Sequence, residues 1–319
     1  MKNRKYFLGV DGGGSKTTAV VFSDDGEFIG RAVGESINYY SVGFENARQA
    51  MKEIMEKLPQ KSFDCAVIGM SALNDRASPD ETERFCSGII DSKKIIMDSD
   101  LYVALEAVGE KGECAVIISG TGSVAALRKS NGEIKHAGGW GYILGDEGSG
   151  YSIGLRGIKT AIRAYEGSAG GTILIQECKE YFDTDNLYDL IDLYYTQKVT
   201  RKKTAAFAAR VCECAENGDK AALKIIETEA DLLSETALAL LKSAKKEIAI
   251  GLWGGVFQHS AVFRDYFIQL LNNQGFENVK LLNFTPEVGA IIACCAEESP
   301  EILDIIKEYA EEAYLNYSK

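Results

Sequence analysis

Short apolar runs alternate with polar turns through the first hundred residues, and their spacing switches repeatedly between strand-like and helix-like periods. Met51, Ile54 and Leu58 recur at helical spacing. A serine followed by Pro79 and Glu81 marks a helix start at Ser78, because serine caps the first turn and proline fits its first position. The predicted order is βββαβαβα, with strands over 7–11, 19–23, 27–33, 65–72 and 94–100 and helices over 44–58, from 78 and over 101–108.

The same alternation restarts near residue 113, after the sequence GEKGE. Its elements are predicted strands over 113–120, 123–129 and 134–139, a helical stretch over 149–246, a strand over 248–255, a helix over 260–274, a strand over 279–283 and C-terminal helices. Repeated β-first halves predict an α/β protein of two domains, 1–113 and 114–319. The second contains the helical insertion, and its C-terminal helix can pack back on the first domain.

Two turns between apolar strands carry glycines and hydroxyls, DGGGSKT at 11–17 and ISGTGS at 118–123. Bare glycine backbone lets N–H groups approach an anion, and Ser15, Thr17, Thr121 and Ser123 add hydroxyl donors. The segment from Gly9 to Lys16 nearly fits a P-loop. However, TTAVVF follows it, and this β-branched run predicts a strand where a P-loop would open a helix. Each turn could also be an ordinary hairpin without a ligand.

Three further segments carry candidate chemistry. The loop GGWGYILGDEGSGYSIG at 138–154 combines glycines, Trp140 and the acids Asp146 and Glu147, which could instead cap the helix expected from Ser149. The sequence DSD at 98–100 ends a strand, where a carboxylate can act as a general base. Asp98 or Ser99 could equally cap the following helix. LWGGVF at 252–257 could lie against a nucleoside or be an ordinary turn.

Composition narrows the function classes. A net charge of −12 argues against sequence-independent nucleic-acid binding and against an anionic membrane surface. The chain has no segment that resembles a signal peptide or a membrane span. Eight cysteines without a CxxC pair, and only two histidines, argue against structural zinc and for reduced thiols in a cytoplasm.

Taken together, these motifs resemble those of the N-acetylglucosamine kinase group of the BadF/BadG/BcrA/BcrD ATPase family, within the sugar kinase–actin–heat-shock chaperone superfamily. DGGGSKT and ISGTGS match the two phosphate motifs, LWGGV resembles the adenosine motif, and GGWGYILGDEGSG is the most specific match. Asn38, in ESINYYSVG, matches the sugar-contacting asparagine. The resemblance covers essentially the whole chain. It implies two ribonuclease H-like, actin-like ATPase domains with mixed βββαβα sheets flanking a nucleotide cleft.

The resemblance also assigns roles by position. Asp11 would hold Mg²⁺ through water, and Asp100 would be the catalytic base, with Asp98 as runner-up. The expected ATP contacts are Gly12, Gly13, Gly14, Ser15, Lys16, Thr17, Gly120, Thr121, Gly122, Gly254 and Gly255. The expected sugar contacts are Asn38, Asp100, Gly139, Trp140, Gly141 and Asp146. Ser15 replaces a common threonine, and Tyr39-Tyr40 differ from the animal enzymes, so the sugar's identity stays open.

The expected function is therefore ATP- and Mg²⁺-dependent phosphorylation of an amino sugar, with N-acetylglucosamine first and glucosamine or N-acetylmuramic acid as alternatives. One rival is a family ATPase that activates a CoA-ester dehydratase or reductase through an iron–sulfur cluster shared between subunits. Another is a non-enzymatic actin-like ATP-binding protein. Small-molecule substrates, no nucleic acid, no membrane and a homodimer complete the expectation.

Overall fold

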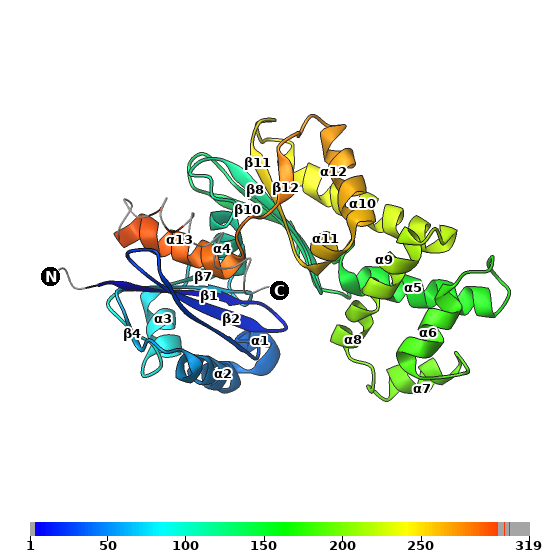
Figure 1. The fold of residues 1–319 in the computed structure, drawn as a ribbon, viewed down its shortest axis with the longest axis horizontal. Coiled ribbons are helices and arrows are strands. Elements are labelled where there is room, and N and C mark those ends of the chain that lie inside the picture. Colours follow the sequence, from blue (N-terminus) through cyan, green and yellow to red (C-terminus); the bar gives the residue numbers. More distant parts are fainter. Residues whose placement is uncertain (1–3, 299–302, 304–305, 307–319) are drawn as a thin grey trace. The chain divides into compact units, whose positions relative to one another are not determined.

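The computed structural model describes residues 4–298, 303 and 306, and it divides the chain into two compact units (Figure 1). Unit 1 comprises Met1–Lys111 and Leu282–Lys319, and unit 2 comprises Gly112–Leu281. The first boundary lies two residues before the predicted one. The segment from Leu282 belongs to unit 1, which is the placement that the sequence left open for the C-terminal helix of the predicted second domain, 114–319.

Unit 1 is built on a five-stranded mixed sheet of order β3-β2-β1-β5-β7. Its strands are β1 (Tyr6–Gly12), β2 (Thr17–Ser23), β3 (Phe28–Gly34), β5 (Cys65–Met70) and β7 (Ile95–Ser99), and a separate two-stranded sheet pairs β4 (Ser62–Phe63) with β6 (Asp91–Ser92). β1, β2 and β3 form antiparallel pairs, whereas β5 runs parallel to both β1 and β7. The carboxyl ends of β1, β5 and β7 therefore meet at one edge of the sheet.

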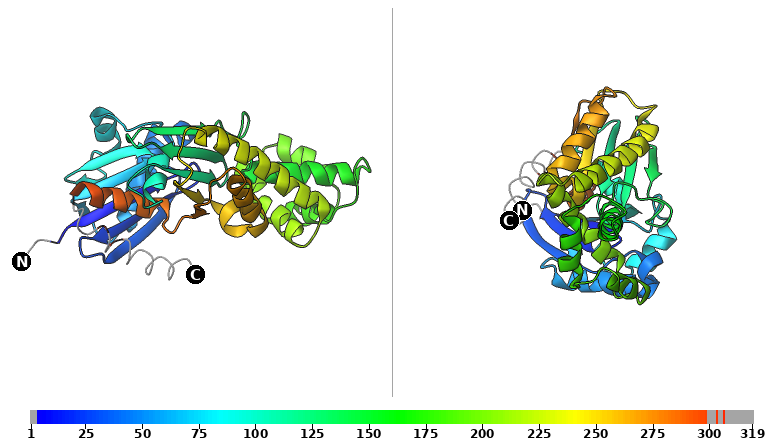
Figure 2. Two further views of the ribbon diagram at one scale, coloured as in Figure 1. Left: turned by 90° about the horizontal axis from the view of Figure 1, so that it is seen from above. Right: turned by 90° about the vertical axis from the view of Figure 1, so that its right-hand side faces the viewer.

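Helices cover both faces of this sheet. They are α1 (Tyr39–Val42), α2 (Phe44–Lys57), α3 (Pro79–Cys86), α4 (Asp100–Glu106) and α13 (Pro286–Glu298). One apolar core joins α2 and α3 to residues such as Leu8 and Ile68, and the other joins α4 and α13 to Phe7 and Val67. Alternating strand residues supply the two cores because successive side chains point to opposite faces. α13 lies against β1 and β5 in the views of Figures 1 and 2.

Unit 2 repeats this topology with the sheet order β10-β9-β8-β11-β12. The strands are β8 (Cys114–Ser119), β9 (Ser123–Arg128), β10 (Ile134–Gly138), β11 (Ala249–Trp253) and β12 (Val279–Leu281). The first three pair antiparallel, and β11 runs parallel to β8 and β12. Two sheets with one shared connectivity confirm the predicted α/β fold of two domains with mixed sheets.

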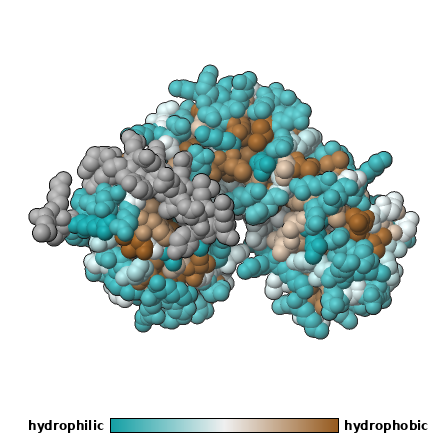
Figure 3. Space-filling view, viewed as in Figure 1, coloured by the Kyte–Doolittle hydropathy of each residue, from teal (hydrophilic) through white to brown (hydrophobic). Residues whose placement is uncertain are grey.

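The predicted helical stretch of unit 2 consists of several helices. They are α5 (Gly150–Tyr165), α6 (Leu174–Phe182), α7 (Asp189–Tyr195), α8 (Arg201–Ala206), α9 (Ala208–Glu216) and α10 (Lys220–Leu241), followed after β11 by α11 (Gly255–His259) and α12 (Ala261–Asn272). α10 packs on β9 and β10 and beside α12 (Figure 1). On the face drawn in Figure 3, hydrophobic residues reach the surface only in separate groups. No helix of the described residues combines the length and apolar character that crossing a bilayer requires.

Candidate functional site

The DGGGSKT segment is a hairpin turn, as predicted, and not a P-loop. β1 and β2 pair antiparallel with Asp11 opposite Thr18 and Gly12 opposite Thr17. A Cβ on Gly12 would lie 2.6 Å from the Ile37 side chain, so packing alone demands this glycine. At Gly14 a Cβ would meet nothing within 4 Å, and its φ is not positive. The fold therefore does not explain Gly14, whereas a ligand that needs bare backbone would.

Polar contacts tie the segment of Asn38 to this turn. The buried Thr17 hydroxyl oxygen accepts a hydrogen bond from the Ile37 N–H at 3.1 Å. Ser36 donates its hydroxyl to the Gly13 carbonyl oxygen at 2.9 Å and accepts the Asn38 N–H at 3.1 Å. Thr17 thus has a structural role beside its predicted ligand role. Ser36 belongs to no recognised motif, so its place beside this turn could not be predicted from the sequence.

Asn38 caps a one-turn helix, α1, that the sequence pattern did not predict. Its side-chain oxygen accepts the N–H groups of Tyr40 at 3.1 Å and Ser41 at 3.3 Å. Its amide nitrogen donates to the Ser71 hydroxyl at 3.0 Å, and the Ser71 N–H donates to the Gly12 carbonyl at 2.9 Å. The side chain is therefore fixed beside the turn, and its second amide N–H makes no hydrogen bond within the described residues.

The three candidate acids of unit 1 gather at the carboxyl ends of its parallel strands. Asp11 and Asp98 both lie in register with Gly69. Asp98 is buried, pairs with the Arg76 Nε at 3.2 Å, and accepts the Ser99 N–H at 2.8 Å. Ser99 caps α4, because its hydroxyl oxygen accepts the Tyr102 N–H at 3.2 Å. Asp98 is thus committed to structural contacts.

Asp100 follows as the first residue of α4, and it is half-buried. Burial raises its pKa to about 6, although the backbone N–H groups of Leu101 and Asp100 oppose the shift. A carboxyl with a pKa near neutrality is suited to accept a proton at physiological pH. These contacts make Asp100 a better base than Asp98.

Asp11 lies among like charges. Burial raises the pKa of its carboxyl well above the ordinary value, Glu287 and Asp100 raise it further, and Lys16 lowers it. A cation would relieve this concentration of negative charge, and Mg²⁺ usually takes only one or two carboxylates while it keeps waters. The donor set fits that ion. Within the described residues no group of three or more His, Cys, Asp or Glu side chains forms a ready metal cage. Glu287 lies in the first turn of α13. Its nearness to Asp11 could not be predicted from the sequence, because most of the chain separates the two residues.

The second phosphate turn, in unit 2, is closed by backbone contacts. The Gly120 N–H donates to the Gly122 carbonyl at 2.9 Å, and the Gly150 N–H donates to the Gly120 carbonyl at 2.8 Å. The Ser123 hydroxyl donates to the Glu147 carbonyl at 2.7 Å. The Ser123 hydroxyl proton is therefore used within the protein, and its predicted role as a donor to a ligand stays a prediction. The Thr121 hydroxyl makes no hydrogen bond among the described residues and keeps its predicted role.

The loop over 138–149 is hydrogen-bonded to this turn at Ser123, which accepts the Gly139 N–H through its carbonyl oxygen at 3.0 Å. Gly139 and Gly141 have φ angles of 74° and 82°, which favour glycine, and Trp140 is 73% exposed. Ser149 caps α5 by accepting the Ser152 N–H at 3.2 Å, so the alternative that Asp146 or Glu147 caps it is wrong.

Asp146 is buried with a φ of 65°, and burial raises its pKa while Arg201 lowers it. The end of the loop is held by Glu229, which is fully buried on α10. Its carboxylate accepts the Gly148 N–H at 2.6 Å, the Ser152 hydroxyl at 2.9 Å and the Arg156 Nε at 2.6 Å. Arg201 and Glu229 lie outside every motif and could not be found from local sequence.

Gly254 and Gly255 join β11 to the short helix α11. Gly254 has a φ of 104°, and a Cβ there would lie 2.3 Å from the Ser119 carbonyl oxygen. The turn thus packs directly on the strand that leads into ISGTGS. The fold explains Gly254, whereas the predicted nucleoside contact stays a prediction.

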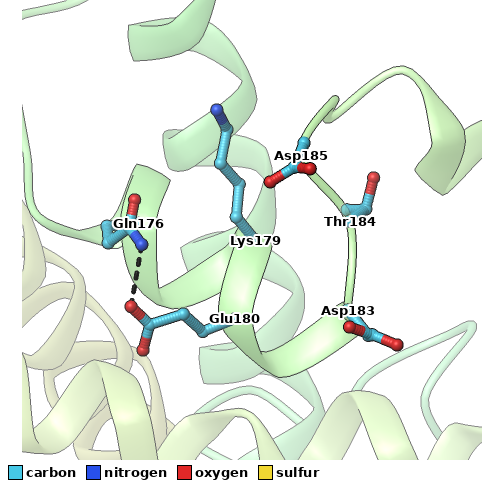
Figure 4. A pocket seen from close by; sticks show the side chains of 6 residues that line it. All are labelled: Gln176, Lys179, Glu180, Asp183, Thr184 and Asp185. Carbon is cyan, nitrogen blue, oxygen red and sulfur yellow. Dashed lines mark hydrogen bonds between the residues drawn. The ribbon is translucent and has the colours of Figure 1, made fainter.

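A separate hollow of about 320 Å³ lies at the end of α6 (Figure 4). Its lining is mainly charged, and Gln176 donates to Glu180 at 2.7 Å within it. It contains none of the predicted site residues, and it therefore has no part in the candidate site. The lining residues are Gln176, Lys179, Glu180, Asp183, Thr184 and Asp185.

Comparison with known proteins gives consistent results. The model of the BadF/BadG/BcrA/BcrD ATPase family matches residues 8–293. An N-acetylmuramic acid/N-acetylglucosamine kinase of Clostridium acetobutylicum is 31% identical over 304 residues, which cover 92% of this chain and 99% of the relative. An N-acetyl-D-glucosamine kinase of Dictyostelium discoideum is 26% identical over 313 residues, covering 91% and 98%. A solved structure from Porphyromonas gingivalis, provisionally assigned as an N-acetylglucosamine kinase, matches with a TM-score of 0.73 at 21% identity, covering 92% and 99%.

Proposed function

The chain belongs to the BadF/BadG/BcrA/BcrD ATPase family, and we propose that it is an ATP-dependent kinase of an amino sugar, N-acetylglucosamine first. The observation that carries the proposal is Asp100. It is a half-buried carboxyl with a pKa of about 6, in the same unit as the DGGGSKT turn. A sugar hydroxyl that accepts the phosphoryl group loses a proton, and a carboxylate of this kind can take it.

The proposed reaction moves the γ-phosphoryl group of ATP to a sugar hydroxyl. The hydroxyl oxygen bonds to phosphorus, the bond to the ADP oxygen breaks, and the Asp100 carboxylate takes the hydroxyl proton. N–H groups at Gly13, Gly14 and Thr121 would hold the phosphates. Mg²⁺, held beside Asp11 through water, would neutralise phosphate charge.

We propose that Asn38, Gly139, Trp140, Gly141 and Asp146 select the sugar. The amide of Asn38 supplies a donor, and the buried Asp146 supplies an acceptor. Trp140 supplies an exposed apolar face suited to a sugar ring or an acetamido methyl group. N-acetylmuramic acid and glucosamine are the alternative substrates, the latter because a carboxylate attracts an ammonium group.

The rival role, an activator with a cluster shared between subunits, needs cysteines at the surface. All eight cysteines are buried free thiols. Burial raises the pKa of Cys86 and Cys178 to about 12, which disfavours the thiolate that binds iron. These observations support the kinase proposal.

We also propose that the protein works in the reducing cytoplasm, with which its free thiols agree. We propose further that it forms a homodimer, which light scattering would test.

Steady-state kinetics over four sugars test the proposal. N-acetylglucosamine should exceed glucose by several orders of magnitude in kcat/KM, because glucose leaves the donor for the acetamido carbonyl unpaired. A kcat/KM for N-acetylmuramic acid comparable to that for N-acetylglucosamine would show that the acetamido site accepts both sugars. A clear preference for glucosamine would show that the site binds a free amino group instead of an acetamido group. ATP hydrolysis that no sugar stimulates would reject the kinase function.

A further inference from the structure

Arg201, the first residue of α8, reaches the candidate sugar loop from outside every motif. Its Nη2 atom donates to the Asp146 Oδ2 atom at 3.1 Å. The guanidinium lies over the Tyr142 ring, 4.9 Å from the ring centre, and Tyr142 in turn packs edge-on against Tyr151 at 4.9 Å. Arg201 is therefore held on two sides, by the loop carboxylate and by an aromatic ring.

Asp146 is the more constrained partner. Its side chain is 4% exposed, against 41% for Arg201. The backbone groups of Ser123 and Gly141 also favour the ionised form of its carboxylate and lower its pKa. A carboxylate offers about four acceptor positions, so the hydrogen bond from Arg201 leaves acceptor capacity for a ligand.

The pair also touches the second phosphate turn. A Cβ at Gly122 would lie 2.8 Å from the Asp146 Oδ2 atom and 3.1 Å from the Arg201 Nη2 atom. The charged groups that act on Asp146 from the described elements are Arg201 on α8, which favours its ionised form, and the neighbouring Glu147, which opposes it. Arg201 is thus the cation that offsets the cost of burying this acid.

We propose that Arg201 is a positioning residue for sugar binding, which holds the Asp146 carboxylate so that an acceptor position not used by Arg201 is directed to a sugar hydroxyl. This inference rests on the proposed function. It differs from a direct role for Arg201 on the nucleotide, which its nearness to Gly122 would also allow.

Kinetics of Arg201→Gln and Arg201→Lys separate these roles. Arg201→Gln should raise the KM for the sugar about tenfold, with kcat and the KM for MgATP changed by less than about twofold. Arg201→Lys keeps the charge and loses the planar fork, so its effect should be smaller. In an Asp146→Asn background, Arg201→Gln should have no further effect, because the pair is already broken.

Arg210→Gln is the matched control, because Arg210 pairs at 3.4 Å with Glu177 and has no part in the site. A rise in the KM for MgATP instead of the sugar would overturn the proposal, as would Arg201 variants indistinguishable from the control. If Arg201→Gln does not fold, Arg201→Lys decides, and an unchanged KM for the sugar would overturn the proposal.

A second readout does not depend on turnover. The ¹³C signal of the Asp146 carboxyl, assigned by its loss in Asp146→Asn, should titrate at higher pH in Arg201→Gln than in the unmodified chain. An unmoved titration would refute the role of Arg201. An unmodified chain that phosphorylates no sugar, with this titration shifted, would instead refute the proposed function alone.

Discussion

At the scale of single residues, the candidate site is held in a state that costs stability. Asp100 keeps a carboxyl half-buried, so its ionised form loses hydration that the two backbone N–H groups only partly replace. The Asp11 carboxyl is likewise costly to ionise, because it is buried and lies near the like charges of Glu287 and Asp100. A ligand or metal ion that neutralises these charges would stabilise unit 1, as is common where function opposes stability.

This cost predicts a pH-dependent effect of Asp100→Asn on unfolding. In the folded chain Asp100 binds a proton with a pKa of about 6, against an ordinary value of 3.8. The folded state therefore holds more protons between these values, and the contribution of Asp100 to stability falls as pH rises from about 4 to 6. Asp100→Asn should be more stable than the unmodified chain by about 1–3 kcal/mol at about pH 8.

The advantage should vanish below about pH 4, where the carboxyl is protonated in both states. Urea unfolding at the two pH values measures it. An equal effect at both would show that packing, and not ionisation, causes the change.

Some of the candidate site residues could be proposed from sequence, and others could not. The glycine and hydroxyl turns, Asp11 and Asp100 follow from local pattern and resemblance. Arg201 and Glu229 act from helices far along the chain, and nothing near them in sequence differs from an ordinary surface arginine or helix acid. The argument for Asp100 over Asp98 as the proposed base also needed the structure, because it depends on the contact of Asp98 with Arg76, which lies on another segment.

At the scale of elements, the sequence predicted helix caps and turns correctly but did not reveal the short helix α1. The capping box of Ser78 and Glu81 is present as predicted. The one-turn helix α1 was missed, because four residues cannot show a helical period. The helices between 150 and 241 were predicted as one largely helical stretch, although Gly167, Gly170 and Gly171 lie between α5 and α6 and Gly218 lies between α9 and α10.

The first phosphate turn allows a test of glycine roles within one element. Gly12→Ala would press on the Ile37 side chain and the Gly69 carbonyl oxygen, so we expect a loss of about 1–3 kcal/mol in stability. Gly14→Ala meets no neighbour and should leave stability within about 0.5 kcal/mol. Its expected effect is weaker MgATP binding.

Thermal melts and MgATP titrations of both variants check this contrast. Unimpaired MgATP binding by Gly14→Ala would remove the argument that the bare backbone serves a ligand.

At the scale of the whole molecule, sequence predicted the repeat and allowed the C-terminal helix to return to the first domain, but it did not locate the point of return at Leu282. Two βββαβα patterns are visible because each keeps its own strand and helix periods. The segment from Leu282 is apolar enough to pack on either sheet, and periodicity says nothing about which one it joins. The structure resolves this through α13, whose Val288 and Ile291 complete the core of unit 1.

Gly289 provides a test of that division. A Cβ there would lie 2.0 Å from the Val103 carbonyl oxygen of α4. Gly289→Ala should destabilise unit 1 by on the order of 2–4 kcal/mol. Hydrogen exchange should become faster in β1 and β5 and stay unchanged in β8 and β11.

Gly171→Ala, in unit 2 and without a neighbour within 4 Å, is the control. Faster exchange in β8 and β11 of Gly289→Ala would show that the two units do not unfold as divided.

The most direct test of the central claim compares Asp100→Asn with Asp98→Asn in a coupled kinase assay, using the sugar that the unmodified chain prefers. If Asp100 is the base, Asp100→Asn should lower kcat by roughly 10²–10⁴ while MgATP binding persists. Asp98→Asn should mainly weaken the contact with Arg76 and lower stability, with a far smaller loss of kcat. A near-normal kcat for Asp100→Asn would contradict the account, and a large loss confined to Asp98→Asn would move the base to Asp98.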